Sequence, residues 1–238
     1  MNTSLNPNTA TPLYQQLMEK ISAKIASGEY QPGDKLPPEI ELAKQNQVSV
    51  ITARKALDEL ARQGHVERRQ GKGTFVAKPK YGRDYTQIQS FSDSCKARGL
   101  LPGASLLRQA LITPGEQICT QLGISKGSQA VEIVRLRYVN AEPMVIETNY
   151  FSVEYAFLLR EDMTSSLFQL LKDYCGITVE KSKKVIEICR ATLEEAQALN
   201  LHTGDALLLV SSVAYTSDNQ PIYVCRQVIN GERFQLIL

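Results

Sequence analysis

Apolar residues recur every four positions near the start of the chain, which is the spacing of one face of an α-helix. Thr11 and Pro12 precede this stripe as the expected N-cap and first helical residue, and Gly28 ends it. Pro38 begins a second, short helix, and Ser49 is a suitable N-cap for a longer third helix. The apolar positions of the first stripe are Leu13, Leu17, Ile21 and Ile25. Two helices joined by a short turn predict a helix-turn-helix.

The segment after the third helix is short, extended and rich in glycine at its centre. Residues 66–69 and 74–77 have the pattern of two strands, and the sequence Gln-Gly-Lys-Gly at residues 70–73 forms the turn between them. Glycine on both sides of Lys72 permits a close approach of the backbone to a phosphate group. The first part of the chain is therefore expected to form a winged helix-turn-helix.

The remaining part of the chain contains an internal repeat. Five anchor residues recur at an offset of 77 positions, which becomes 78 after the turn between two strands. Each copy is expected to contain a short helix, a long strand, a turn ending in proline and a return strand. The paired anchors are Leu122 and Leu199, Gly127 and Gly204, Tyr138 and Tyr215, Pro143 and Pro221, and Phe151 and Ile229. This pattern predicts an α+β domain whose sheet is built from two related hairpins.

A change of composition separates the two parts. Proline, glycine and alternating charges replace any apolar period at residues 78–84. We therefore expect a domain of residues 1–78, a linker of residues 79–90 and a domain of residues 91–238. The net charge of +2 divides unevenly, because residues 1–80 carry a net +4 and residues 81–238 a net −2. A positive N-terminal part suits nucleic acid, although this excess alone is small.

Composition excludes several classes of protein. With 43% hydrophobic and 22% charged residues, the 238-residue chain is suited to a globular fold. No apolar stretch reaches the roughly 20 residues that cross a bilayer, and the polar start lacks the profile of a secretion signal. Five cysteines without a Cys-x-x-Cys pair argue against a disulfide framework and a zinc site. We expect a cytoplasmic protein without membrane contact, metal or cofactor.

The start of the third helix carries side chains that suit DNA. In a helix-turn-helix this end enters the major groove, where arginine pairs with guanine and valine contacts a thymine methyl group. The alternative is that Val50 and Thr52 only border the core and that the charged hairpin is an ordinary solvated surface. We favour DNA binding for Ser49, Val50, Thr52 and Arg54 on the helix and for Arg68, Arg69 and Lys72 on the wing.

These motifs resemble the GntR family of bacterial transcription regulators. The resemblance rests on Pro12-Leu13-Tyr14-x-Gln16, Pro32-Gly33-x-x-Leu36-Pro37-x-Glu39-x-Glu41-Leu42-Ala43, Val48-Ser49-x-x-Thr52-x-Arg54-x-Ala56-Leu57 and Gly71-Lys72-Gly73-Thr74-Phe75-Val76. The second part is similar to the UTRA effector-binding domain of the HutC subfamily at Phe91 to Gly99, Arg135-x-Arg137, Pro143, Glu147, Ser166-Leu167 and Gly231-x-Arg233-Phe234. The resemblance implies a winged helix-turn-helix joined to a chorismate-lyase-like antiparallel-sheet domain.

The resemblance also implies partners and site residues. Members of the HutC subfamily are homodimers, mostly repressors, that leave a palindromic double-stranded operator when a small metabolite binds. Many members carry arginine where this chain has Ile40 and Val50, so its operator is expected to differ. The expected DNA-binding residues are Tyr14, Lys35, Glu39, Ser49, Val50, Thr52, Arg54, Arg68, Arg69, Gly71, Lys72, Gly73 and Thr74.

The strand at residues 131–139 indicates where an effector binds. Alternation places Arg135 and Arg137 on one partly apolar face, where guanidinium groups are costly unless an anion or a carboxylate meets them. Glu147 on the return strand is the candidate carboxylate. The second copy has Ser212, Ala214 and Cys225 at the equivalent positions, which suggests one ligand pocket per chain.

The start of a helix supplies further donors. Free backbone N–H groups near Ser165 and Ser166 favour an anion, so we expect a phosphorylated sugar or another anionic metabolite. The alternative is an Arg–Glu bridge that only stabilises the fold, with an ordinary serine cap. The expected effector-binding residues are Phe91, Ser92, Arg135, Arg137, Glu147, Ser165, Ser166 and Tyr223, where Tyr223 replaces an acidic residue common in the family.

Two functions remain open at this point. The preferred one is a sequence-specific transcription regulator, with repression favoured over activation. The rival is a metabolite-processing lyase or hydrolase that carries a DNA-binding anchor, because the resembled fold also hosts a lyase. The two histidines, His65 and His202, lie in different parts of the chain, and no catalytic residue is predicted.

Overall fold

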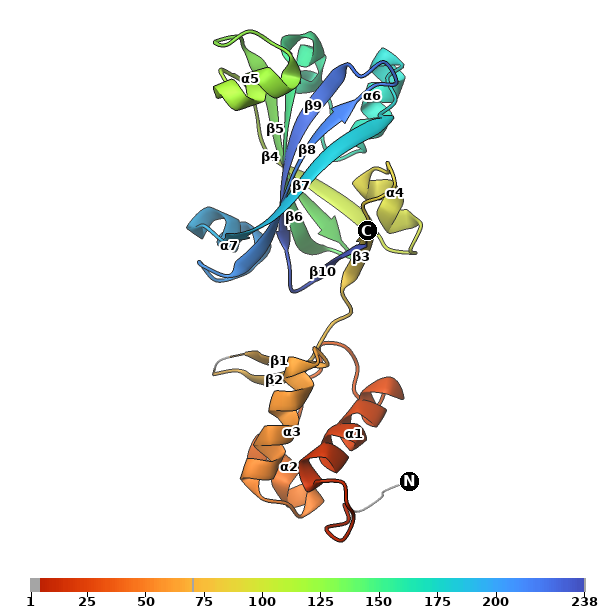
Figure 1. The fold of residues 1–238 in the computed structure, drawn as a ribbon, viewed down its shortest axis with the longest axis vertical. Coiled ribbons are helices and arrows are strands. Elements are labelled where there is room, and N and C mark those ends of the chain that lie inside the picture. The colour runs from red at the N-terminus through yellow and green to blue at the C-terminus, as the bar shows by residue number, and fades with distance from the viewer. Residues whose placement is uncertain (1–4, 70, 238) are drawn as a thin grey trace. The chain divides into compact units, whose positions relative to one another are not determined.

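The computed structural model describes residues 5–69 and 71–237, which form two compact units (Figure 1). The first unit is Met1–Pro79 and the second is Lys80–Leu238. Gln70, which belongs to the expected wing turn, lies outside the described residues. Each unit buries an apolar core of its own.

Three helices build the first unit, as predicted. Leu17 and Ile21 from the first apolar stripe pack in one core with Leu57. Ser49 caps the third helix, because its hydroxyl accepts a hydrogen bond from the Thr52 backbone N–H at 3.0 Å. Pro12 is the N-cap of the first helix and not its first helical residue. The bounds are α1 (Leu13–Ala26), α2 (Glu39–Asn46) and α3 (Val50–Arg62).

The predicted wing is present. β1 (Val66–Arg69) and β2 (Gly73–Val76) form an antiparallel hairpin. Gly73 has a φ of 118° and faces the Lys35 side chain, so a Cβ at this position would meet Lys35 Cε at 2.8 Å. The backbone conformation favours glycine there, and any other residue would also require the flexible Lys35 side chain to move.

A six-stranded sheet forms the centre of the second unit (Figure 1). The strands follow the order β4-β5-β6-β9-β8-β7, and all five pairings are antiparallel. The bounds are β4 (Pro102–Ile112), β5 (Ala130–Val139), β6 (Glu142–Ser152), β7 (Lys181–Arg190), β8 (Ala206–Tyr215) and β9 (Pro221–Asn230). The α+β class with an antiparallel sheet is therefore confirmed.

The order of the strands reflects the internal repeat. The two expected hairpins are β5-β6 and β8-β9, and they meet where β6 pairs with β9. Thr148 pairs with Arg226, 78 positions later, and the flanking pairs are Glu147 with Gln227 and Asn149 with Cys225. A shift of 78 positions exchanges these two flanking pairs. The sheet therefore has a pseudo-two-fold axis that passes between Thr148 and Arg226.

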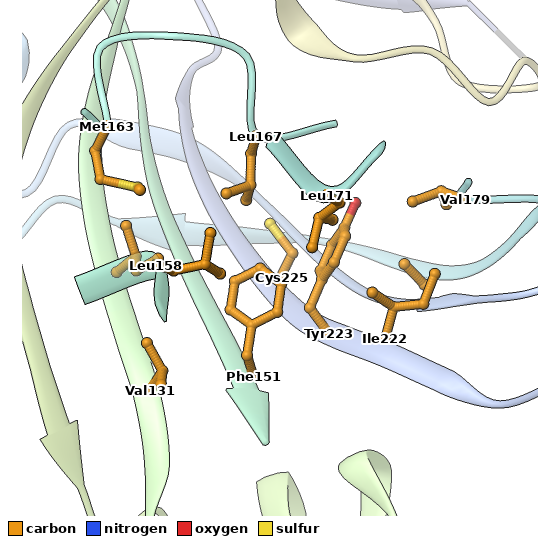
Figure 2. Close-up of a cluster of buried hydrophobic side chains, with 12 residues drawn as sticks. Val131, Phe151, Leu158, Met163, Leu167, Leu171, Val179, Ile222, Tyr223 and Cys225 are labelled. Atoms are coloured by element: carbon orange, nitrogen blue, oxygen red, sulfur yellow. The ribbon is translucent and has the colours of Figure 1, made fainter. Parts of the chain in front are cut away.

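Short helices flank the sheet, and the second repeat has the predicted capping box. Thr192 and Glu195 each accept from the other's backbone N–H at the start of α7. The bounds are α4 (Phe91–Lys96), α5 (Glu116–Leu122), the 3-10 segment η1 (Val153–Arg160), α6 (Leu167–Cys175) and α7 (Leu193–Leu199). Residues of η1 and α6 pack on the sheet in an apolar cluster that includes Phe151, Leu158, Leu171 and Tyr223 (Figure 2).

Residues expected in the linker belong to the second unit. β3 (Tyr81–Asp84) pairs in parallel with β10 (Phe234–Ile237), far along the chain. Tyr81 is buried, and its ring lies 5.0 Å from that of Phe234. The connection that we expected to extend to residue 90 therefore ends before β3. A four-residue strand is too short to show an apolar period, which explains the difference.

Candidate functional site

Glu39, at the start of α2, holds two arginines from other elements of the first unit. Its carboxylate accepts hydrogen bonds from Arg54 Nε at 2.9 Å and from Arg68 Nη1 at 3.0 Å. Arg68 also forms an ion pair with Asp58 at 2.8 Å. Partial burial acts to raise the pKa of Glu39, but the hydrogen bonds from both arginines lower it below its ordinary value. We name Glu39, Arg54 and Arg68 the exposed cluster.

We call the N-terminal end of α3, which is expected to face the DNA bases, its reading end. The polar side chains of Ser49 and Thr52 at this end form hydrogen bonds with neighbouring groups of the chain. The hydroxyls of Ser49 and Thr52 lie 2.8 Å apart and form a hydrogen bond with each other. Val50 is 38% exposed, so it does not belong to the buried core. Thr52, the other residue of that alternative, is half-buried, so the DNA-binding role of both residues stays a prediction.

The remaining predicted DNA-binding residues lie on α1, on the wing and, in the case of Lys35, on the segment before α2. Lys55 Nζ lies 4.0 Å from the centre of the Tyr14 ring, and the Arg69 guanidinium stacks on Phe75. Gly71 and Lys72 are exposed, and Lys35 lies against Gly73. Thr74 differs from the others because it is buried, so its side chain is not on the exposed face of the wing.

A cavity in the second unit collects most of the expected effector-binding residues. Its volume is about 60 Å³, well below the roughly 300–1,000 Å³ of typical small-molecule sites, so a ligand larger than a few water molecules requires its side chains to move. Ser165 does not line it, because its hydroxyl donates to the Asp162 carbonyl at 3.0 Å. The expected residues that do line it are Phe91, Ser92, Arg135, Arg137, Glu147, Ser166 and Tyr223.

Two arginines in this cavity surround one carboxylate. Arg135 Nη2 donates to Glu147 at 2.5 Å, and Arg137 Nη1 lies 3.7 Å from the same oxygen. Arg135 also donates to the Ser165 carbonyl at 3.0 Å, and Arg137 donates to the Ser92 hydroxyl at 3.0 Å. All three charged side chains are less than 10% exposed. We name Arg135, Arg137 and Glu147 the buried cluster.

The charges of the buried cluster do not balance. Burial alone would raise the pKa of Glu147, but the nearby Arg135 and Arg137 lower it to about 2. Burial lowers the pKa of Arg137 to about 10, which still leaves it a cation at neutral pH. Two positive charges therefore meet one negative charge in a region with little water, and one positive charge remains without a matching anion.

Several donors in the cavity have no acceptor. Arg135 Nε, Arg137 Nε and Asn149 Nδ2 are buried and have no hydrogen-bond partner among the described residues. All three residues line the cavity. Buried donors without acceptors are costly, so this arrangement favours a ligand that brings several acceptor atoms.

Sequence reasoning missed a second group of cavity residues. Tyr85 donates its hydroxyl to Gln227 Oε1 at 3.1 Å, and Gln227 Nε2 in turn donates to Glu147 at 2.8 Å. Lys184 Nζ donates to the Tyr85 carbonyl at 2.9 Å, and the Arg83 guanidinium lies 4.9 Å from the Tyr85 ring. The repeat held a signal for Gln227, which stands 78 positions after Asn149. Arg83 and Tyr85 lay in the expected linker and had no such signal.

Both halves of the repeat contribute to one cavity. Ser212 and Cys225, the counterparts of Arg135 and Glu147, also line the cavity. Burial raises the pKa of the Cys225 thiol well above its ordinary value, so Cys225 is a neutral wall residue at pH 7. The expected single pocket is thus shared by the two halves.

The described residues show neither a metal-binding cluster nor a helix that could span a membrane. No group of three or more histidine, cysteine, aspartate or glutamate side chains is arranged to hold a metal ion within residues 5–69 and 71–237. In the same residues, no helix combines the length and the apolar character that crossing a membrane requires.

Comparison with known proteins identifies both units. Residues 13–76 match the model of bacterial regulatory proteins of the gntR family, and residues 97–235 match the UTRA domain. The HTH-type transcriptional repressor NagR of Bacillus subtilis is 33% identical over 98% of this chain and 97% of its own length. The "Probable fructoselysine utilization operon transcriptional repressor" of Escherichia coli K12 is 29% identical over 95% of this chain and 93% of its own.

A solved structure agrees with these matches. The crystal structure of PhnF from Mycobacterium smegmatis has 26% sequence identity and superposes with a TM-score of 0.67. The similarity covers 93% of this chain and 97% of PhnF. Relatives of nearly equal length therefore share the two-domain architecture.

Proposed function

Since this chain belongs to the gntR family of bacterial regulatory proteins and carries a UTRA domain, we propose that it represses transcription from a palindromic operator and that a small anionic metabolite releases it. The observation that carries the effector part is the set of three buried donors without acceptors in the cavity. The relatives are named as transcriptional repressors and not as enzymes, so the lyase or hydrolase alternative loses its support.

The first unit supplies the DNA contacts in this proposal. The start of α3 enters the major groove, while the wing carries Arg69 and Lys72 to the neighbouring backbone. The exposed cluster offers guanidinium groups to phosphates, since their pairs with Glu39 are solvent-exposed and therefore weak. A palindromic operator implies a homodimer, which we include in the proposal together with action in the cytoplasm.

The chemistry of the cavity defines the class of effector. An oxyanion, such as a phosphate group, would accept from the free Nε atoms of Arg135 and Arg137 and neutralise the unmatched charge. The Ser166 hydroxyl and Asn149 Nδ2 supply neutral hydrogen bonds for hydroxyl or carbonyl groups of the same ligand. A phosphorylated sugar combines both kinds of group.

A hydrogen-bonded chain connects the cavity to the segment that follows the first unit. Glu147 accepts from Gln227, and Gln227 accepts from Tyr85, which comes directly after β3. An anion that draws Arg135 or Arg137 away from Glu147 alters the first member of this chain. The altered hydrogen bond changes the relative populations of two conformations of β3 and of the connection to the DNA-binding unit.

The proposal is tested by finding the effector and then removing one of its contacts. A thermal-shift screen with phosphorylated sugars, amino acids and phosphonates identifies ligands that raise the melting temperature. The compound found is then titrated against the protein bound to its own promoter DNA. Arg137→Ala is expected to retain DNA binding and lose release, whereas the exposed control Arg160→Ala responds like the wild type.

Three outcomes would contradict the proposal. Binding to DNA without sequence preference would remove the specific regulator. Consumption of the metabolite would support the enzyme. Normal release by a folded Arg137→Ala protein would show that the cavity is not the effector site.

A further inference from the structure

Three large apolar side chains are exposed at the starts of the two helices of the helix-turn-helix. Ile51 is 78% exposed, Ile40 is 72% exposed and Val50 is 38% exposed. Val50 and Ile51 are the first two residues of α3, and Ile40 is the second residue of α2. None of the three belongs to the core of the first unit. Their packing within the chain therefore does not account for them.

The polar groups beside these residues are already occupied. Ser49 and Thr52 share a hydrogen bond, and Ser49 also caps the backbone of α3. Arg54, one turn after Val50, donates to Glu39. Ser49 and Thr52 are thus less available to the bases than the three apolar side chains, while Arg54 can exchange its exposed pair with Glu39 for a phosphate contact.

The major groove of DNA has one apolar feature that such a surface fits. Thymine presents its 5-methyl group there, and valine or isoleucine gains by removing that methyl from water. Cytosine, adenine and guanine carry no methyl group there, so an isoleucine that faces them gains no such apolar contact. An apolar reading end therefore discriminates in favour of thymine.

We propose that Ile40, Val50 and Ile51 read thymine methyl groups, so that the operator carries thymine where the reading end of α3 meets the bases. This inference rests on the proposed DNA binding and specifies its base chemistry. Electrostatic attraction from the wing supplies affinity, while the three side chains supply sequence preference.

The test compares thymine with uracil, which lacks only the 5-methyl group. The preferred duplex is first selected from a random library with the full-length protein. Each thymine is then replaced by uracil in turn, and the dissociation constant is measured. Loss of one buried methyl contact is expected to weaken binding about fourfold.

Side-chain variants assign the contact to this surface. Ile40→Ala, Val50→Ala and Ile51→Ala are each expected to abolish the preference for thymine over uracil at one position. Val185→Ala, at an exposed valine of the second unit, serves as the control and retains every preference. Because the three side chains are exposed, these variants are expected to keep the wild-type melting temperature.

The outcomes separate this inference from the function on which it rests. A selected duplex that binds equally well with uracil overturns thymine reading and leaves the regulator intact. Selection of guanine at the positions facing α3 would likewise overturn thymine reading and leave the proposed regulator intact. Failure to select any sequence overturns the proposed function itself.

Discussion

The two units each contain two arginines around one glutamate, but in opposite surroundings. In the exposed cluster, Arg54 keeps 61% of its side chain in solvent while it bonds to Glu39. In the buried cluster, Arg135 keeps 2% and Glu147 8%. Separating these three groups therefore changes the free energy little in the first unit. In the second unit, leaving one of them without its partner is expected to raise the free energy of the folded state strongly. Under the proposed function, surroundings and not residue types decide which cluster contacts phosphates and which binds an anionic effector.

The largest expected contrast comes from removing the carboxylate. Glu147→Gln leaves two buried guanidinium groups without an anion and is expected to lower the free energy of unfolding by about 3–5 kcal/mol. The matched variant Glu39→Gln is expected to cost about 0–1 kcal/mol, because its arginines return to water. Urea unfolding of the full chain, followed by circular dichroism, measures both. Equal losses would show that the clusters do not differ in the way proposed.

Acid sharpens the same contrast. The pKa of Glu147 in the folded chain, about 2, lies below its ordinary value of 4.5, so its charge adds stability above pH 4.5. This contribution is lost as the pH falls from 4.5 toward 2, and it amounts to a free energy on the order of 3 kcal/mol. Urea midpoints of the wild type are expected to fall more steeply over this range than those of Glu147→Gln. Parallel curves would mean that other groups cause the acid sensitivity.

A smaller effect is expected from the chain that connects the buried cluster to β3. Tyr85→Phe removes the hydrogen bond to Gln227 and leaves the ring in place. We expect the coupling free energy between effector binding and DNA binding to fall by about 1 kcal/mol, so the effector changes the affinity for DNA by roughly fivefold less. The effector is expected to bind with wild-type affinity while releasing less DNA. Calorimetry measures the first quantity and fluorescence anisotropy of labelled DNA the second. Wild-type release by this variant would exclude Tyr85 from the coupling.

Salt is expected to give the smallest difference. Between 0.05 and 0.5 M NaCl, screening removes the stabilisation of the exposed cluster, so the cost of Glu39→Gln falls from about 0.5 kcal/mol toward zero. The cost of Glu147→Gln is expected to remain, since buried pairs are screened much less. The same urea experiment at both salt concentrations measures the change. A similar salt response of both variants would indicate that water reaches the buried cluster.

The sequence predicted elements whose pattern is local. The helix stripe of α1, the Ser49 cap and the capping box at Thr192 depend on residues within a few positions, and the structure confirms them. Arg135, Arg137 and Glu147 were found because alternation along one hairpin places them together.

Residues brought in by distant pairing were not predictable in this way. β3 pairs with β10, about 150 positions later, and only this pairing brings Arg83 and Tyr85 to the cavity. Thr74 has the residue type of a phosphate contact, yet the wing packs it inward. Neither fact has a signature within a short window of sequence.

The cavity is lined by residues from both of the halves that the pseudo-two-fold axis between Thr148 and Arg226 relates. The two halves can therefore change independently in evolution. In the proposed site, the first half supplies the charged groups that bind the anion. The second half lines the rest of the cavity with Ser212, Tyr223 and Cys225. Under this proposal, substitutions in the second half change which molecule fits the cavity and leave the residues that bind the anion unchanged. If the proposed effector site is correct, such a division would allow related proteins to respond to new effectors while the scaffold and the two arginines are kept.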